Sequence, residues 1–401
     1  MKNHFPDLAR ILSRRSSRRR FLKLMGASLG LAGLTACRRQ PEGKVIPYGH
    51  GKEHAVAGVV DHYATAMEIG AVAVGLLVTA VDGRPIKVEG NPIHPASLGS
   101  AGRFAQASIL ELYDPDRSRS PIFRLDGPEG SQRQSRSWDE FRRFAEGHFA
   151  RSRVDRGKGL AVISETTSSV SMTAIRARWD QAFPEAAWYE YEPISRDQER
   201  AATLWAWNRS LRPHLHLHKA RIIVCFSECL LDEHPNAIRH AHDWAENRDA
   251  VEHGAMCRLH VVETGYSVTG AMADHRLASR PREIENMVFE LARRMEAFQA
   301  DPSPLPEEQN AFIERLVADL KAHAGRSLVV AGPTLPVETH VLCHRLNEVL
   351  GNIGKTIDYL PDPFPNRPHH LEAIKTLASR LEAGEIHTLL LLGGNPAYNA
   401  P

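Results

Sequence analysis

The sequence is poor in cysteine and has no long apolar run. Its 401 residues include five cysteines, and none lies between Cys37 and Cys225. So few cysteines exclude a disulfide-rich scaffold. The apolar stretch 24–34 is diluted by glycine and is too short to cross the bilayer, which takes about 20 helical residues. With 42% hydrophobic and 24% charged residues, the chain has the composition of a globular protein.

Positive charge is scarce outside the N-terminus. The formal net charge is +2, but residues 1–36 alone carry +7, so the remainder carries −5. A nucleic-acid-binding protein needs basic residues on its folded part. We therefore predict no nucleic-acid partner.

The basic N-terminus is typical of a twin-arginine export signal. Arg18 and Arg19 precede the glycine-rich apolar stretch, and Leu34-Thr-Ala-Cys37 resembles a bacterial lipobox. We predict that residues 1–37 are signal and lipobox. Acylated Cys37 would then anchor the exported chain to the lipid of the cytoplasmic membrane, on its periplasmic face. An ordinary cleavage site beside a chance cysteine is the alternative.

The remaining chain divides into three stretches. Residues 38–54 are polar, contain Pro and Gly, and indicate a tether. Residues 55–125 contain short apolar runs broken by turns, which predicts a small β-rich module. In it, two β-rich runs joined through Asp82-Gly83 predict a hairpin.

Residues 126–401 alternate apolar runs with helical patterns. A helix is expected after Ser137, its N-cap, with Glu140 at the third position. Buried strands that alternate with helices predict a parallel sheet covered on both faces, so the fold class is α/β. The expected strands are 160–163, 222–225, 259–262, 328–331 and 389–392, and the expected helices are 168–182, 235–247, 281–299, 306–324, 336–350 and 367–383.

Two segments, 75–95 and 112–122, resemble the N-terminal iron–sulfur module of the molybdopterin oxidoreductases. In that family, cysteine thiolates hold a [4Fe–4S] cluster. The matching positions here are Met67, Gly70 and Val74, which supply no thiolate or imidazole. The resemblance thus implies a degenerate module that binds no cluster.

Segments 269–277, 349–357 and 392–401, with the N-terminal signals, resemble one branch of that family. This branch is the large molybdopterin-oxidoreductase-like subunit of alternative complex III, the TAT-variant-translocated type. Its members are longer, so the resemblance implies a chain truncated at its C-terminus. It also implies a non-catalytic scaffold in a quinol:electron-acceptor oxidoreductase of the respiratory chain.

The implied partners are a membrane quinol-oxidising subunit, haem c subunits and a ferredoxin-like iron–sulfur domain. This chain would bind no cofactor itself, since the partners or a C-terminal half would carry the iron–sulfur clusters and haem. A genuine molybdopterin-dependent periplasmic oxidoreductase is the alternative.

Three histidines, His214, His216 and His218, alternate with leucine. Strand side chains alternate between faces, so the three imidazoles would share one face of an extended segment. Such a row could bind zinc or copper. Because no carboxylate or cysteine lies nearby in the sequence, a polar segment facing solvent or a partner is the favoured interpretation.

Cys225 and Cys229 have three residues between them, which is not the spacing of a zinc or redox motif, and we expect them to be buried and structural. A disulfide among them, Cys257 and Cys343 stays open. Three further motifs are weak. Residues 351–356 lack a glycine needed for a phosphate loop, 274–276 are expected to pair within the fold, and Gly393-Gly394 follows a strand as in a pterin-binding loop.

Overall fold

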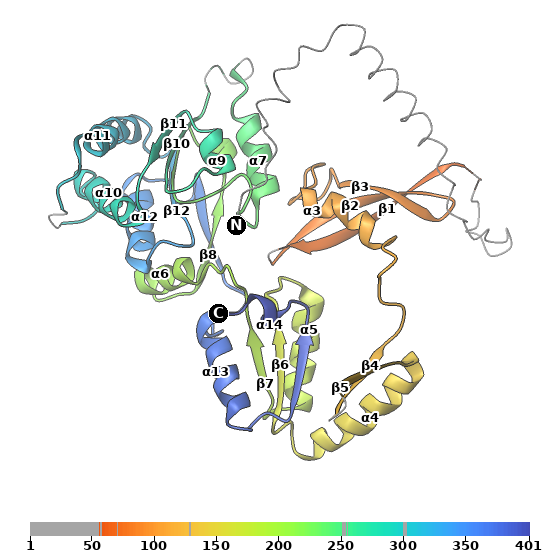
Figure 1. Ribbon diagram of the computed structural model, residues 1–401. Helices are drawn as coiled ribbons and strands as arrows, with labels where there is room; N and C mark the ends of the chain where they lie inside the picture. The colour runs from red at the N-terminus through yellow and green to blue at the C-terminus, as the bar shows by residue number, and fades with distance from the viewer. Residues whose placement is uncertain are drawn as a thin grey trace, which may run out of the picture. The chain divides into compact units, whose positions relative to one another are not determined.

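A computed structural model describes most of the chain after residue 55 (Figure 1). The described residues are 56, 58–69, 71–127, 130–250, 254, 256–299 and 303–401. The chain separates into two units, Met1–Val59 and Val60–Pro401, and the second is described here. Arg18, Arg19, Cys37 and the tether 38–54 lie outside the described residues. In the described part, no helix is long and apolar enough to cross a membrane.

The second unit begins with a three-stranded antiparallel sheet of β1 (Val60–Ile69), β2 (Val72–Val81) and β3 (Arg84–Gly90). The predicted hairpin is confirmed. Its two turn residues, Asp82 and Gly83, have φ angles of 49° and 75°. Two consecutive residues with positive φ are typical of the type I′ turn, whose twist matches that of the flanking strands.

A helix and an exposed hairpin follow this sheet. Helix α3 (Arg103–Glu111) buries Ala105 against Val74 and Val88. Strands β4 (Ile122–Gly127) and β5 (Gly130–Ser135) then form a separate antiparallel pair.

The larger parallel sheet has the strand order β11-β10-β9-β12. Its strands are β9 (Ile222–Phe226), β10 (Arg258–Glu263), β11 (His275–Ala278) and β12 (Ser327–Ala331), and every neighbouring pair is parallel. The predicted strands 222–225, 259–262 and 328–331 are confirmed. From β9 the chain proceeds outward through β10 to β11, whereas β12 lies on the opposite side of β9.

Both faces of this sheet are covered, as the apolar runs predicted. Val224 and Phe226 point into one core, and Ile223 and Cys225 point into the other, because successive strand residues face opposite sides. Trp244 packs on the second face. The first face is covered by α10 (Pro281–Arg294), α11 (Glu307–Ala322) and α12 (Val337–Val349), and the second by α7 (Ala237–Glu246).

A second parallel sheet is separate from the first and has the order β14-β6-β7. The sequence predicted strands 160–163 and 389–392, but not their assignment to a different sheet. Its elements are β6 (Leu160–Ser164), β7 (Ala187–Glu190), β14 (Thr388–Leu392), with α13 (His370–Glu382) against its core and α5 (Val170–Ala182) preceding β7. Helix α4 (Trp138–Val154) begins with the predicted capping box of Ser137 and Glu140.

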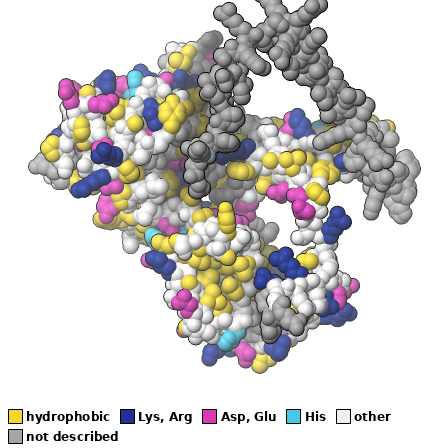
Figure 2. All heavy atoms as spheres, in the orientation of Figure 1, with side chains coloured by type: hydrophobic (Ala, Val, Ile, Leu, Met, Phe, Trp, Pro, Cys, Tyr) yellow, Lys and Arg dark blue, Asp and Glu magenta, His cyan; other side chains and the backbone are white. Residues whose placement is uncertain are grey.

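Strand β14 is an edge strand, and its end is uncovered. Leu391 and Leu392 are 52% and 40% exposed. Figure 2 shows hydrophobic side chains gathered over this part of the molecule.

An antiparallel pair of β8 (Leu211–Leu215) and β13 (Ile357–Pro361) was not predicted. Each strand contains or ends at a proline and carries polar side chains, so neither matches the apolar pattern of a buried strand. Helix α6 (Asp197–Trp207) precedes β8 and packs on α12. The short elements are η2 (Leu217–Lys219), α9 (Val268–Ala271) and α14 (Pro396–Asn399).

Candidate functional site at the carboxyl ends of the parallel sheets

The larger sheet has a topological switch point between β9 and β12. In open α/β sheets, ligands bind outside the carboxyl ends of the strands at this point. Here the two strand ends are joined by backbone contact, because the Gly332 amide donates to the Phe226 carbonyl at 2.8 Å. A Cβ on Gly332 would overlap the backbone oxygen of Ser227. Glycine is therefore required, and the backbone narrows the crevice.

An ion cluster fills the space next to this contact. Arg196, just before α6, lies 2.7 Å from the Glu199 carboxylate and 2.6 Å from the Glu228 carboxylate. Burial lowers the pKa of Arg196, but the charges of Glu199 and Glu228 outweigh burial and raise it. Burial raises the pKa of Glu228, and Arg196 opposes that rise. The cluster thus supplies its own counterions.

Two buried histidines of α12 lie beside the cluster. Burial lowers the pKa of His340, and it lowers the pKa of His344 to about 4. Both imidazoles are therefore neutral near pH 7. His344 Nδ1 lies 2.8 Å from the Tyr359 hydroxyl.

The cavity that these side chains enclose is small, with about 20 Å³ available to the centre of a water molecule. Its lining includes Arg196, Glu199, Glu228, His340 and His344. Such a volume holds a single water, for which about 10–15 Å³ suffices. A dinucleotide does not fit there.

The carboxyl edge of the second sheet is also occupied by the chain's own side chains. Gly393 and Gly394 follow β14 with φ angles of 73° and 64°. A Cβ on Gly393 would lie 2.9 Å from Glu165 Oε2, and one on Gly394 would lie 3.1 Å from Glu165 Cγ. The two glycines therefore lie against a carboxylate that follows β6.

Further carboxylates lie at this edge. Glu190, at the end of β7, pairs with Arg176 at 2.5 Å. Burial raises the pKa of Glu192, and the charges of Glu165, Glu190 and Glu68 raise it further, against a hydrogen bond from the Thr166 amide. The raised pKa indicates that negative charge is already in excess here.

The N-terminus of α5 is another potential anion site, and Glu68 of β1 occupies it. The Glu68 carboxylate accepts from the Ser168 amide at 2.7 Å and from the Thr167 hydroxyl at 2.9 Å. Helix N-termini favour anions because their amides are unpaired. This position is therefore filled by a side chain rather than left for phosphate.

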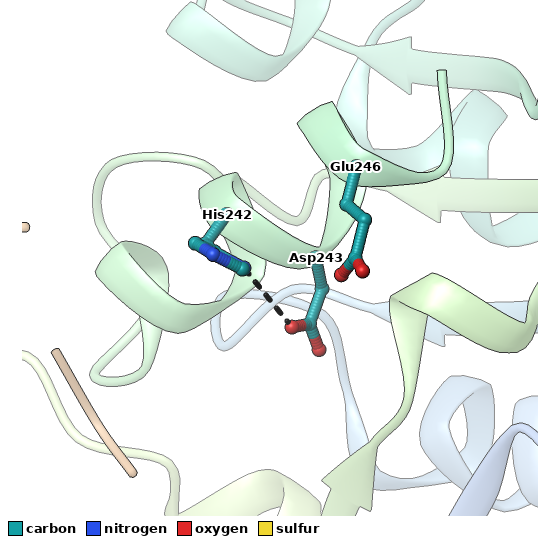
Figure 3. Close-up of side chains that lie close together, drawn as sticks. All are labelled: His242, Asp243 and Glu246. Carbon is teal, nitrogen blue, oxygen red and sulfur yellow. Dashed lines mark ion pairs between the residues drawn. The ribbon is translucent and has the colours of Figure 1, made fainter. Parts of the chain in front are cut away.

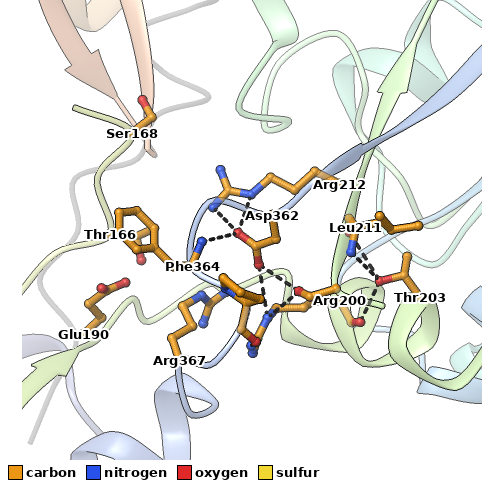
Figure 4. A network of polar contacts seen from close by, with 12 residues as sticks. Thr166, Ser168, Glu190, Arg200, Thr203, Leu211, Arg212, Asp362, Phe364 and Arg367 are labelled. Atoms are coloured by element: carbon orange, nitrogen blue, oxygen red, sulfur yellow. Dashed lines mark hydrogen bonds and ion pairs between the residues drawn. The ribbon is translucent and has the colours of Figure 1, made fainter. Parts of the chain in front are cut away.

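A polar network fixes the segments around α6 and β13 (Figure 4). Asp362 lies 3.2 Å from Arg200 and 3.0 Å from Arg212, and it accepts from the Ser210 hydroxyl at 2.9 Å. Burial raises the pKa of Asp362, but Arg212 and the hydrogen bonds lower it overall. All its strong contacts are internal, so we assign it a structural role.

The predicted degenerate cluster positions lie on β1 and β2. Met67 and Val74 are direct cross-strand partners. Val74 is 3% exposed, and Met67 packs against the same apolar core. Gly70 lies outside the described residues. An apolar pair thus occupies two of the positions where the family has cysteines.

The histidine row differs from its prediction. Strand β8 ends at Leu215, so His214 lies in the strand and His218 in a 3₁₀ turn rather than on one extended segment. The neighbouring rings still lie 4.8 and 5.7 Å apart. Carboxylates distant in the sequence reach the row: Asp358 lies 2.8 Å from His216, and Asp243 lies 3.1 Å from His218.

The four cysteines of the described part are buried, and their thiols are free in this structure. They are Cys225, Cys229, Cys257 and Cys343. Burial raises the pKa of the Cys257 thiol to about 12. The prediction of buried, structural cysteines at 225 and 229 is confirmed.

The other motifs are part of the fold. Asn352, in the segment that resembles a phosphate loop, is fully buried and accepts from the Ser327 hydroxyl at 3.2 Å. Asp274 pairs with Arg248 at 2.7 Å, and Arg276 pairs with Glu263 at 2.6 Å. The expectation that residues 274–276 pair within the fold is confirmed.

Comparisons with known proteins support this fold. No family model matches the chain. Over 85 residues it is 35% identical to the menaquinone reductase, molybdopterin-binding-like subunit, of Nitratidesulfovibrio vulgaris, which covers 21% of this chain and 12% of that protein. Over 247 residues it is 24% identical to a sulfite dehydrogenase subunit of Allochromatium vinosum, which covers 60% of this chain and 24% of that protein.

Among solved structures, acetylene hydratase from Pelobacter acetylenicus matches 73% of this chain and 44% of that chain. The TM-score is 0.50 and the sequence identity is 12%. The chain is molybdopterin-oxidoreductase-like, with a mixed α/β fold. The matches span less than half the length of each of these proteins.

A molybdopterin dinucleotide is the group that this fold implies, and the residues at the two edges do not fit it. A pyrophosphate needs amide or cationic donors and open space. The described edges instead offer Glu165, Glu192, Glu199 and Glu228, with Arg196 already paired to two of these carboxylates.

Proposed function

We propose that the chain is a non-catalytic scaffold in a quinol:electron-acceptor oxidoreductase of the alternative complex III type. Cys37 would anchor it to the periplasmic face of the cytoplasmic membrane after twin-arginine export. Its partners would be a membrane quinol-oxidising subunit, haem c subunits and a ferredoxin-like iron–sulfur domain. They, and not the described part of this chain, would carry the haem and the clusters.

The observation that carries this proposal is the filling of both sheet edges by internal charges. The Arg196–Glu228 pair and its 20 Å³ cavity occupy one edge, and Glu165 lies against Gly393 and Gly394 at the other. The apolar pair Met67 and Val74 supports it at the cluster positions. The match to a protein named molybdopterin-binding-like agrees with a retained fold and an altered site.

Purification from detergent-solubilised membranes of the native host tests the proposal. We expect the tagged chain to bring down partners with the visible absorption of c-type haem and of iron–sulfur clusters. Cys37→Ser should shift the free chain to the soluble fraction, and Arg18→Lys with Arg19→Lys should keep it in the cytoplasm. A chain that purifies from membranes without haem or clusters would contradict the assignment to this complex.

A second candidate is a genuine molybdopterin-dependent periplasmic oxidoreductase. The match to the sulfite dehydrogenase of Allochromatium vinosum favours it, because it extends over 60% of the chain. This candidate requires pterin in the purified protein, and the filled edges argue against it.

A further inference from the structure

Three potential metal ligands converge on one face of α7 (Figure 3). His242 and Glu246 lie one helical turn apart, and Asp243 follows His242. One ligand atom from each residue lies within 4.8 Å of the other two. The His242 side chain is 39% exposed and Glu246 is exposed, so solvent reaches the group.

The donor atoms differ in how they are used. His242 Nδ1 is buried and has no hydrogen-bond partner, because Asp243 Oδ1, at 3.7 Å, is too distant for a hydrogen bond. An unpaired imidazole nitrogen between two carboxylates is a suitable donor for a metal ion. Mixed nitrogen and oxygen donors favour zinc, copper or nickel, whereas magnesium and calcium prefer oxygen alone.

Asp243 is held in place from behind. His218 Nδ1 lies 3.1 Å from its Oδ2 atom, and Arg239 Nε donates to its Oδ1 atom at 2.7 Å. Partners of this kind fix the orientation of a ligating carboxylate. Arg239 also neutralises one of the two carboxylates. With neutral imidazoles, Arg239, Asp243 and Glu246 together carry a charge of −1, which still attracts a cation.

We propose that His242, Asp243 and Glu246 bind a divalent transition-metal ion, zinc above all, with water completing the coordination. Three protein ligands plus water is a common tetrahedral arrangement for zinc. The site does not depend on the function proposed above. It also gives the carboxylate-paired His218 a role as a positioning residue, acting through Asp243.

Titration of the full chain with Zn²⁺ and Co²⁺, in metal-free buffer and without a polyhistidine tag, tests the site. We expect one ion per chain by calorimetry and Co²⁺ absorption bands in the visible. His242→Ala and Glu246→Gln should each weaken binding by about tenfold or more. Both side chains are open to solvent, so circular dichroism and Tm of the metal-free variants should match those of the parent.

Matched variants separate this site from adventitious binding. His387→Ala removes another exposed histidine and should leave Zn²⁺ affinity unchanged. Arg239→Gln removes a competing cation and should tighten binding, and His218→Ala should alter the Co²⁺ spectrum. Zn²⁺ affinity that is absent in the parent, or that is the same in parent, His242→Ala and Glu246→Gln, would overturn the proposal. So would equal or weaker binding in Arg239→Gln.

Discussion

The two carboxyl edges differ in how the chain closes them. At the β9–β12 edge, Arg196 and two carboxylates form a compact cluster that largely neutralises itself. At the β6–β7–β14 edge, Glu165 and Glu192 lie together with less compensation, and Glu192 has a raised pKa. The comparison teaches that a ligand edge can be closed by paired charge or by unpaired negative charge. Only paired charge is expected to stabilise the fold.

The largest effect is expected at the paired edge. Arg196→Met leaves Glu228 buried without its counterion and should lower the free energy of unfolding by about 3 kcal/mol or more. Urea unfolding measures it. The matched control is Arg345→Met, whose pair with Glu348 is half exposed, and there the change should stay within about 0.5 kcal/mol. Equal losses in the two variants would contradict the buried-pair account.

A smaller effect is expected at the glycine pair. Gly393→Ala places a Cβ at a positive φ and 2.9 Å from Glu165, and should cost about 1–2 kcal/mol. Gly384→Ala has a similar φ of 68° with open space around it, so it measures the backbone cost alone. Thermal unfolding should therefore show the larger Tm decrease for Gly393→Ala. If Gly384→Ala lowers Tm as much, Glu165 does not fill the site.

The pH dependence separates the edges further. His344 has a folded pKa of about 4, below its ordinary value of 6.5, so folding releases a proton in this window. Its contribution is fully present above pH 6.5 and is lost as the pH falls towards 4. Glu192 has a raised pKa, so its contribution is present at low pH and is lost as the pH rises through the folded pKa.

Two variants check these opposite signs. His344→Gln should flatten the loss of stability between pH 6.5 and about 4. Glu192→Gln should stabilise the protein at neutral pH relative to the parent, and the difference should shrink in acid. Urea unfolding across pH 4–8 measures both. A parent and Glu192→Gln with parallel stability curves would show that Glu192 is not destabilised by its neighbours.

The smallest effect is expected at the α5 N-terminus. Glu68→Gln keeps the shape but removes the negative charge at the helix end, which should cost about 0.3–1 kcal/mol. The exposed residue Glu89, paired with Lys87, gives the control Glu89→Gln, with an expected change near zero. A Glu68→Gln variant as stable as the parent at low salt would remove the helix-end interaction from the account.

Much of the fold was predictable because its signals are local. The apolar run of β9 and the capping box of Ser137 and Glu140 each lie within a few residues, and both are confirmed. The β8–β13 pair was missed because proline, arginine and histidine conceal its period. The division into two sheets depends on long-range pairing, such as β14 with β6, which no local pattern encodes.

The site was less predictable than the fold. Arg196 and Glu228 are 32 residues apart, and nothing in their spacing shows that they pair. A glutamate two residues after a buried strand was the one available signal. The histidine row was noticed, but its carboxylates, Asp243 and Asp358, are 25 and 142 residues away from their partners. Distance in the sequence concealed both groups.

The central claim is that the chain's own charges occupy the place of a pterin dinucleotide. The most direct test is molybdenum, tungsten and pterin analysis of the purified full chain. We predict that neither metal and no pterin is present, whether or not zinc is bound at α7. Molybdenum or tungsten in equal amount to the protein, together with pterin, would contradict the account.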